Sequence, residues 1–467
     1  MISIQLENKV GPVKPLNGVN NGPLGSLSVD KSREFREARI PFSRLHDTEG
    51  CYGSGVFVNI HCIFPNFEAD VDSPDSYFFD ATDIYIKAII DAGTQVFYRL
   101  GETIENSSRL RIFAKPPKDF QKWAQICAHI VMHYNEGWAN GFHYDIQYWE
   151  IWNEPENQSM WSGGTPEQYY ELYHITATLL KNRFPNIKVG GFVSSGFYDI
   201  TRPDMTPQVK SWIPFAENFF RYITRPDKNS PLDFFSWHQY PFDPKEVGIH
   251  ARFAQSLLNK YGFDNAENIL NEWNYCDTQD LEDVKKRKNH FGAAMMGAVL
   301  SEMQKSPITA AMYYDAEIKR TVYCGIFDLY TKKVLKPYYA LYYFGKLLDL
   351  GTEVETRADG ENVYVIAARN GEASGVFVTN FSYLSRKETI TFDREVQVNA
   401  VYVTNGAVTN ALQPDRVAGK RTQAIPGATT STLVADYAAG DWTQTLSLTL
   451  QPYEILYLEL IKTTGEY

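Results

Sequence analysis

Short apolar runs alternate with segments of helical periodicity from about residue 38 to residue 350, and this alternation is the strongest constraint on the fold. The apolar runs predict strands at 40–46, 56–64, 95–100, 148–152, 187–193, 232–240, 268–273 and 308–314. The intervening periodicity predicts helices at 79–92, 120–134, 166–183, 210–223, 245–261, 287–304 and 337–350. Eight strands joined by helices predict a (β/α)8 TIM barrel. A doubly wound open sheet is the alternative, and the count of eight favours the barrel.

The two ends of the chain have a different texture. Residues 1–37 predict an arm, because 3–6 alternates like a short strand and Gly and Pro recur from residue 17 to residue 25. We expect this arm to pair with a sheet elsewhere. After Gly351, short alternating runs separated by turn residues predict an antiparallel β-sandwich domain over 351–467. The predicted organisation is therefore an arm (1–37), a barrel (38–350) and a β-domain (351–467).

Charge and cysteine usage exclude several classes of partner. The 467 residues carry a net charge of −11 and no long basic run, which argues against nucleic acid or an anionic membrane as the partner. The five cysteines are odd in number and lack metal-ligand spacing, which indicates reduced thiols. The first residues lack a signal-peptide pattern, so we expect a cytoplasmic protein as the chain stands, and a periplasmic or secreted one if a signal was removed. The sequence leaves the oligomeric state open and is compatible with a homo-oligomer.

Two strand ends carry a glutamate in similar surroundings. The fourth predicted strand ends in Asn153-Glu154-Pro155, and the seventh contains Asn271-Glu272-Trp273. Proline disfavours a helical conformation in the residue before it, so we expect Glu154 to be extended at the strand tip. The period of two places Glu150, Trp152 and Glu154 on one face, with Arg44 as the candidate partner of Glu150.

Active sites of such barrels lie at the carboxyl ends of the strands. The strand ends supply Arg44, His46, Asp47, His61, Asn153, His238, Tyr240 and Tyr314 as candidate substrate-binding residues, with Trp161 in the loop after the fourth strand. Structural roles compete with these assignments: an ion pair at the barrel bottom for Arg44 and His46, core packing for the His and aromatic residues, and lid packing for Trp161. A metal site formed by His46, His61 and His238 has no supporting spacing, so we expect no metal and no cofactor.

The fourth and seventh of eight strands lie nearly across the barrel from each other, which predicts that Glu154 and Glu272 face one another. Two facing carboxyl groups are what glycoside hydrolysis requires, one to protonate the leaving oxygen and one to attack the anomeric carbon or activate water. Burial among Trp149, Trp152 and Trp161 would raise the pKa of the acid.

These motifs resemble clan A of the retaining glycoside hydrolases. The strand-end Asn153-Glu154-Pro155, the later Glu272, the sixth-strand run 237–240, the run 336–342 and the trailing β-domain are most similar to glycoside hydrolase family 39. The resemblance implies that Glu154 is the acid/base, that Glu272 is the nucleophile, and that Asn153 donates to the sugar hydroxyl next to the anomeric carbon. Family 39 contains β-xylosidases and α-L-iduronidases. The first strand (Arg44 to Asp47) and the eighth (Tyr314 and Asp315) depart from the expected pattern at the sugar subsite.

The predicted function is therefore a retaining exo-glycosidase, most like a β-xylosidase, acting on an oligosaccharide or other glycoside. The alternatives are a glycosidase of the same clan with arabinofuranosidase, β-galactosidase or uronidase specificity, a catalytically dead carbohydrate-binding barrel, or a metal hydrolase that uses the strand-end histidines.

Overall fold

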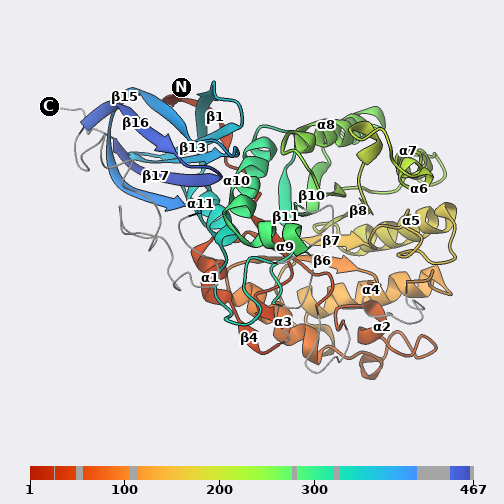
Figure 1. The fold of residues 1–467 in the computed structure, drawn as a ribbon. Coiled ribbons are helices and arrows are strands. Elements are labelled where there is room, and N and C mark those ends of the chain that lie inside the picture. The colour runs from red at the N-terminus through yellow and green to blue at the C-terminus, as the bar shows by residue number, and fades with distance from the viewer. Residues whose placement is uncertain are drawn as a thin grey trace.

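The computed structural model describes the chain except residues 26, 49–55, 105–113, 276–280, 319–322, 324, 407–441 and 463–467. Figure 1 shows a barrel surrounded by helices and, to one side of it, a curled β-sheet beside which the N-terminus lies. The predicted combination of a TIM barrel with a C-terminal antiparallel domain is confirmed.

The barrel is a closed sheet of eight parallel strands. Around the barrel they follow one another as β2 (Gly18–Asn20), β5 (Phe42–Arg44), β6 (Gln95–Leu100), β7 (Tyr148–Ile151), β8 (Lys188–Ser194), β9 (Phe234–Gln239), β10 (Glu267–Trp273) and β11 (Ala310–Tyr313). A short antiparallel pair, β3 (Leu24–Gly25) and β4 (Val29–Asp30), follows β2.

The first barrel strand is β2, inside the segment that the sequence assigned to the arm. It pairs with β11 on one side and β5 on the other. Gly18 makes this close approach possible, because a Cβ there would lie 2.7 Å from the carbonyl oxygen of Ala311. The strand predicted at 56–64 is wrong: its described residues form a turn and the short helix α2 (Ile60–Ile63). One predicted strand is lost and one that was not predicted is gained before β6, so β7 and β10 are still the fourth and seventh strands.

The barrel helices are α1 (Ser32–Glu37), α3 (Asp80–Asp91), α4 (Phe120–Asn135), α5 (Pro166–Arg183), α6 (Pro207–Lys210), α7 (Trp212–Ile223), α8 (Lys245–Lys260), α9 (Leu281–Lys288), α10 (His290–Gln304) and α11 (Lys336–Leu350). Seven of them (α3, α4, α5, α7, α8, α10 and α11) match the predicted ones, whereas α1, α6 and α9 were not predicted. Single-turn 3₁₀ helices lie at Pro74–Ser76, Trp138–Asn140 and Tyr198–Ile200. Helix α5 begins with a capping box, in which Thr165 and Gln168 each bond the other's backbone N–H.

The second sheet has seven strands in the order β1 (Ile2–Pro12), β12 (Thr352–Ala358), β13 (Val363–Asn370), β14 (Ala373–Asn380), β17 (Glu454–Lys462), β15 (Arg386–Thr404) and β16 (Trp442–Leu450). The expected pairing of the N-terminal segment is seen in β1, which lies antiparallel to β12. Its first residues, Ile2 to Ile4, also pair in parallel with β15, so the sheet curls back on itself. The runs predicted at 389–392 and 400–404 belong to one long strand, β15.

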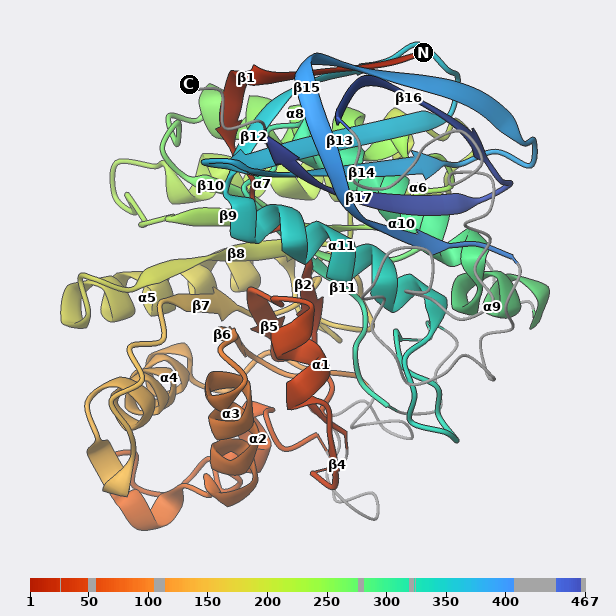
Figure 2. The same cartoon turned by 90° about the vertical axis from the view of Figure 1, so that its left-hand side faces the viewer.

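Helix α11 joins the two parts of the molecule and lies between the barrel and the sheet (Figure 2). Its Tyr343 is fully buried and contacts the rings of Phe377, Tyr402 and Tyr457 from the sheet. The apolar core of the barrel therefore continues onto one face of the sheet, while the enclosed face has its own aliphatic core.

The barrel interior is layered. An apolar cluster fills its lower part with side chains of Phe42, Phe97, Tyr148, Phe234, Ile269, Ala310 and Met312. Polar side chains lie above this cluster, toward the carboxyl ends of the strands. Among the described cysteines, Cys62 and Cys127 are free thiols, whereas Cys51, Cys276 and Cys324 lie outside the described residues. Within the described part of the chain, none of the helices has the length and apolar character needed to cross a bilayer.

Candidate active site

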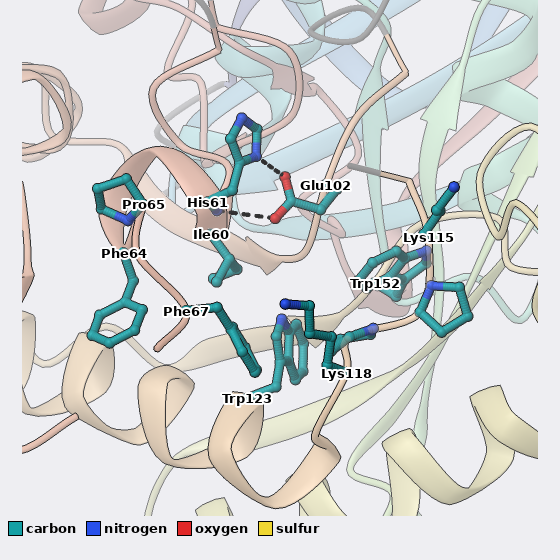
Figure 3. Close-up of a pocket in the computed structure, with 12 residues that line it drawn as sticks. Ile60, His61, Phe64, Pro65, Phe67, Glu102, Lys115, Lys118, Trp123 and Trp152 are labelled. Atoms are coloured by element: carbon teal, nitrogen blue, oxygen red, sulfur yellow. Dashed lines mark hydrogen bonds and ion pairs between the residues drawn. The ribbon is translucent and has the colours of Figure 1, made fainter. Parts of the chain in front are cut away.

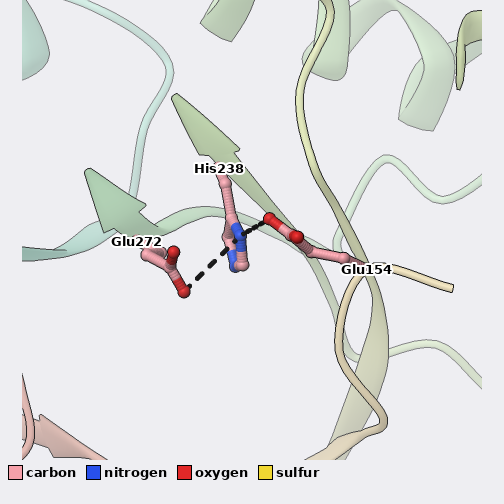
Figure 4. Close-up of side chains that lie close together, drawn as sticks. All are labelled: Glu154, His238 and Glu272. Carbon is pink, nitrogen blue, oxygen red and sulfur yellow. Dashed lines mark hydrogen bonds and ion pairs between the residues drawn. The ribbon is translucent and has the colours of Figure 1, made fainter. Parts of the chain in front are cut away.

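Two glutamates face each other at the carboxyl ends of opposite strands, with a histidine between them (Figure 4). His238, at the end of β9, places its Nδ1 atom 2.7 Å from Oε1 of Glu154 and 3.6 Å from Oε2 of Glu272. One oxygen of each carboxyl group lies within 4.8 Å of one oxygen of the other. This separation is close to the spacing of about 5–5.5 Å between the carboxyl groups of retaining enzymes and smaller than the spacing of about 6.5–9.5 Å that a direct attack by water requires.

The turn that carries Glu154 is not extended as predicted. Glu154 has a φ of 45° and Trp152 a φ of 72°, so both lie in the left-handed region that non-glycine residues rarely occupy. The N–H of Glu154 donates to the carbonyl of Val193 at 3.0 Å, and Val193 itself has a φ of 64°. Each such residue costs about 1–3 kcal/mol, and the surrounding contacts must hold it in place. Strand β7 ends at Ile151, so Trp152 does not share the inner face of Glu150; its indole donates outward to the carbonyl of Met160 at 2.8 Å.

Arg44 organises the layer beneath the two glutamates. It is completely buried and donates to Glu150 at 2.7 Å, as predicted, and to Glu272 at 3.1 Å. It also donates to the side-chain oxygens of Asn20 at 3.0 Å and Asn153 at 2.8 Å. Burial lowers the pKa of the Arg44 guanidinium, whereas the negative charges of Glu150 and Glu272 raise it. The second effect is larger, so the pKa lies above its ordinary value. Arg44 is therefore a permanent cation that touches Glu272 directly.

Glu272 is surrounded by donors. Tyr240 donates its phenolic proton to Oε1 at 2.7 Å, and His46 places its Nε2 atom 3.5 Å from Oε2. Burial and the neighbouring Glu272 raise the pKa of Tyr240 well above 10, so its phenol keeps its proton. Glu272 therefore lies next to three polar or charged side chains, those of Arg44, Tyr240 and His46.

Glu154 has the opposite environment. Burial raises its pKa above the ordinary value of 4.5, although His46 and Arg44 act in the other direction. Burial also lowers the pKa of His238 to about 3, so the imidazole beside Glu154 is neutral at physiological pH. A neutral imidazole can accept a hydrogen bond from the carboxylic acid or, as the other tautomer, donate one to the carboxylate, so His238 can bond Glu154 in either protonation state of Glu154.

Asp47 and Tyr314 form a second layer of residues behind His46. Asp47 lies 3.1 Å from Nδ1 of His46 and accepts the phenolic proton of Tyr314 at 2.9 Å. Asn21 donates to Asp47 at 3.0 Å. These two predicted residues therefore reach Glu272 through His46 and do not touch it directly.

His61 and Trp161 lie away from the two glutamates. His61 forms an ion pair with the buried Glu102 and lines a separate pocket with Phe67, Trp123 and others (Figure 3). Trp161 is 2% exposed, packs edge-on against Trp152 and Tyr169, and donates to the carbonyl of Thr165. The structure thus assigns Trp161 to the core rather than to a stacking surface.

Several polar residues of the site were missed by sequence reasoning. Asn20 and Asn21 belong to the N-terminal segment, and Ser236 and Asn271 both donate to Glu150 from neighbouring strands. Asn271 and Ser236 lie on strands whose inward positions could have been counted from Glu272 and His238, whereas nothing in the glycine-rich N-terminal segment marked Asn20. Among the described residues, a metal could be held by Glu154, His238 and Glu272, or by Asp47, Asp315 and Glu317; neither group contains His61.

An eight-stranded parallel barrel with two facing glutamates at its strand ends has the architecture of a barrel glycoside hydrolase. The family follows from the sequence comparison. The profile of the glycosyl hydrolases family 39 matches residues 47–380, and the chain belongs to this family.

Curated relatives and solved structures agree with this placement. A β-xylosidase of Caldicellulosiruptor saccharolyticus is 26% identical over 178 residues (36% of this chain and 32% of the relative), and one of Geobacillus stearothermophilus is 24% identical over 197 residues (40% and 35%). The matched region thus spans about a third of these relatives. The fold is shared with a glucosidase of Croceicoccus marinus (TM-score 0.74, 19% identity) and a monomeric β-xylosidase of Caulobacter crescentus (TM-score 0.68, 15% identity), each over 99% of both chains.

Proposed function

We propose that the protein is a retaining, exo-acting glycosidase of β-xylosidase type, with Glu272 as nucleophile and Glu154 as acid/base. The observation that carries the proposal is the short separation of two carboxyl groups with opposite environments. Glu272 accepts hydrogen bonds from the Arg44 cation and from Tyr240, whereas burial favours the protonated form of Glu154. The β-xylosidase activity of the two curated relatives supports xylose as the first sugar to test.

The two displacements use the same pair of residues. In the first, Glu272 attacks the anomeric carbon, the bond to the leaving oxygen breaks, and Glu154 gives its proton to that oxygen. In the second, Glu154 takes a proton from water, the water oxygen attacks the anomeric carbon, and Glu272 leaves. The net stereochemistry is retained because each step inverts the anomeric carbon once.

Two further residues are placed to hold the sugar. Arg44 donates a hydrogen bond to the side-chain oxygen of Asn153. This bond fixes the amide group, so its nitrogen is oriented to donate to a sugar hydroxyl. His46 lies next to Glu272 and is held in place by Asp47. We therefore expect His46 to contact the sugar ring on the side away from Asn153.

The test is a panel of nitrophenyl glycosides (β-xyloside, α-L-arabinofuranoside, β-galactoside and a uronide), followed by NMR of the anomer that is released first. We expect turnover of the xyloside with retained configuration. First release of the inverted anomer would refute the retaining mechanism, and sugar binding without release of nitrophenol would show a carbohydrate-binding barrel.

Replacement of the nucleophile gives an independent check. Glu272→Ala is expected to lower turnover by at least about 10⁴-fold, and azide should then restore it by forming a glycosyl azide of inverted configuration. Turnover that is unchanged in this variant would remove Glu272 from the mechanism.

A further inference from the structure

A third carboxyl group lies next to the proposed acid/base and has no role in the two displacements. Glu156 follows Glu154 by two residues and is 8% exposed. Its Oε1 atom accepts the hydroxyl proton of Ser194 at 3.0 Å and the N–H of Ser195 at 2.5 Å, both at the end of β8. Its Oε2 atom is buried and has no hydrogen-bond partner. A buried carboxyl group that is only half satisfied is costly, so its presence needs a physical reason.

The same end of β8 holds Glu154 and borders His238. The carbonyl of Val193 accepts the N–H of Glu154 at 3.0 Å, immediately before the two serines that bind Glu156. Ser194 also accepts the N–H of Gly196 at 3.2 Å, and a Cβ on Gly196 would lie 2.7 Å from the carbonyl oxygen of His238. Glu156 therefore belongs to a group of neighbouring contacts that links Glu154, the end of β8 and the backbone of His238.

We propose that Glu156 is a positioning residue for Glu154: its carboxyl group ties the end of β8 to the turn after β7 and so fixes the place from which the acid/base proton is delivered. This inference rests on the acid/base role proposed above for Glu154. Without the tie, the left-handed backbone at Glu154 and Val193 relaxes, and the Glu154 carboxyl group moves away from the leaving oxygen.

The electrostatics agree with this geometry. Burial, followed by the nearby Glu154, raises the pKa of Glu156 to about 8. The titratable groups around it are Glu154 on its own segment, and Glu167, Tyr169 and Tyr170 of α5. Glu156 is therefore largely neutral at pH 7 and places no charge beside Glu154, so its link to Glu154 is the geometry of its hydrogen bonds.

The experiment compares two substrates of the sugar that the panel identifies. One has a nitrophenyl leaving group, which departs with little need for a proton, and the other an alkyl or unsubstituted phenyl group, which depends on the acid. In Glu156→Ala we expect kcat/KM to fall about 10- to 100-fold for the poor leaving group, because a general acid contributes about 10²- to 10⁴-fold. For the nitrophenyl substrate we expect kcat/KM to change little. Glu167→Gln, exposed at the start of α5, is the matched control and should behave as the wild type.

Glu156→Gln gives the second readout. The amide oxygen can accept the same two bonds as the carboxyl group, so we expect Glu156→Gln to restore near wild-type kcat/KM on both substrates. An equal loss on both substrates in Glu156→Ala, or a loss in Glu156→Gln as large as that in Glu156→Ala, would overturn the positioning role. If Glu156→Ala does not fold, Ser194→Ala, which removes the hydroxyl donor to Glu156, takes its place and should show a loss confined to the poor leaving group.

The Glu154→Gln variant separates this inference from the proposed function. If Glu154→Gln does not discriminate between the two leaving groups, the acid/base assignment fails. If it discriminates and the Glu156 variants do not, only the positioning role fails.

Discussion

Arg44 and Glu272 lie 3.1 Å apart on strands that are separated by two others in the barrel, and Arg44 is completely buried. The guanidinium also bonds Glu150 beneath it, so one cation serves a structural carboxylate and the proposed nucleophile. Arg44 therefore contributes both to the stability of the barrel interior and to the surroundings of Glu272, and the two contributions can be separated by mutation.

Arg44→Met should lower the free energy of unfolding by about 3–5 kcal/mol, because it leaves Glu150 buried without its partner. The double variant Arg44→Met/Glu150→Met should recover most of this loss but none of the activity, since Glu272 still lacks its cation. Chemical denaturation and kcat/KM of both variants test the prediction. Recovery of activity in the double variant would show that Arg44 acts only on stability.

Tyr240→Phe removes the 2.7 Å hydrogen bond to Glu272 and leaves the ring. A hydrogen bond to a charged group contributes about 1.5–3 kcal/mol, so kcat/KM should fall about 10- to 100-fold. The matched control is Tyr338→Phe on α11, which loses a buried bond to the carbonyl of Glu34 at 2.9 Å. An equal loss in both variants would indicate a general effect on folding.

The alkaline limb of the kcat/KM profile should report the loss of the Glu154 proton. Because burial raises the pKa of Glu154, its acid form persists above pH 4.5, and the midpoint of the limb should lie above that value. Glu154→Gln, assayed with a nitrophenyl glycoside, should lack this limb. An alkaline limb that is identical in the variant would assign the titration to another group.

A buried carboxyl group in the sheet should make stability depend on pH. Glu454 is 2% exposed and accepts from Asn405 at 2.9 Å, and burial raises its pKa to about 7. The folded state therefore binds this proton more tightly than the unfolded chain, so stability is full below about pH 4 and falls as the pH rises to about 7.

Glu454→Gln should remove this fall. Its stability relative to the wild type should rise by roughly 3 kcal/mol between pH 4 and pH 8. Denaturation of both proteins across this range measures the difference, with the exposed Glu361→Gln as control. A constant difference between variant and wild type at all pH values would contradict the shifted pKa.

The location of the proposed catalytic pair could be predicted from the sequence, whereas the conformation of Glu154 could not. Asn153-Glu154-Pro155 and Glu272 each follow a strand pattern that periodicity reveals. Proline favours an extended residue before it, but the hydrogen bond from Glu154 to Val193 overrides this local preference. The partner strand that supplies Val193 is 39 residues away in the sequence, so no local pattern contains it.

Contacts between distant segments also decided which segment forms the first strand of the barrel. Residues 56–64 have the apolar character of a strand, yet the place beside β5 is taken by β2, a three-residue strand with no periodicity to detect. Gly18 and Asn20 are suited to this position by their contacts with Ala311 and Arg44, which come from other strands.

By itself, the sequence determined the alternation of strands and helices, the trailing β-domain and the two glutamates, because each depends on residues close together in the chain. Tertiary structure alone decided which segment is the first strand, which donors surround Glu272, and that Glu156 shares the end of β8 with Glu154. These features depend on pairings between distant segments, whose energies are set by packing and burial and leave no periodic trace in the sequence.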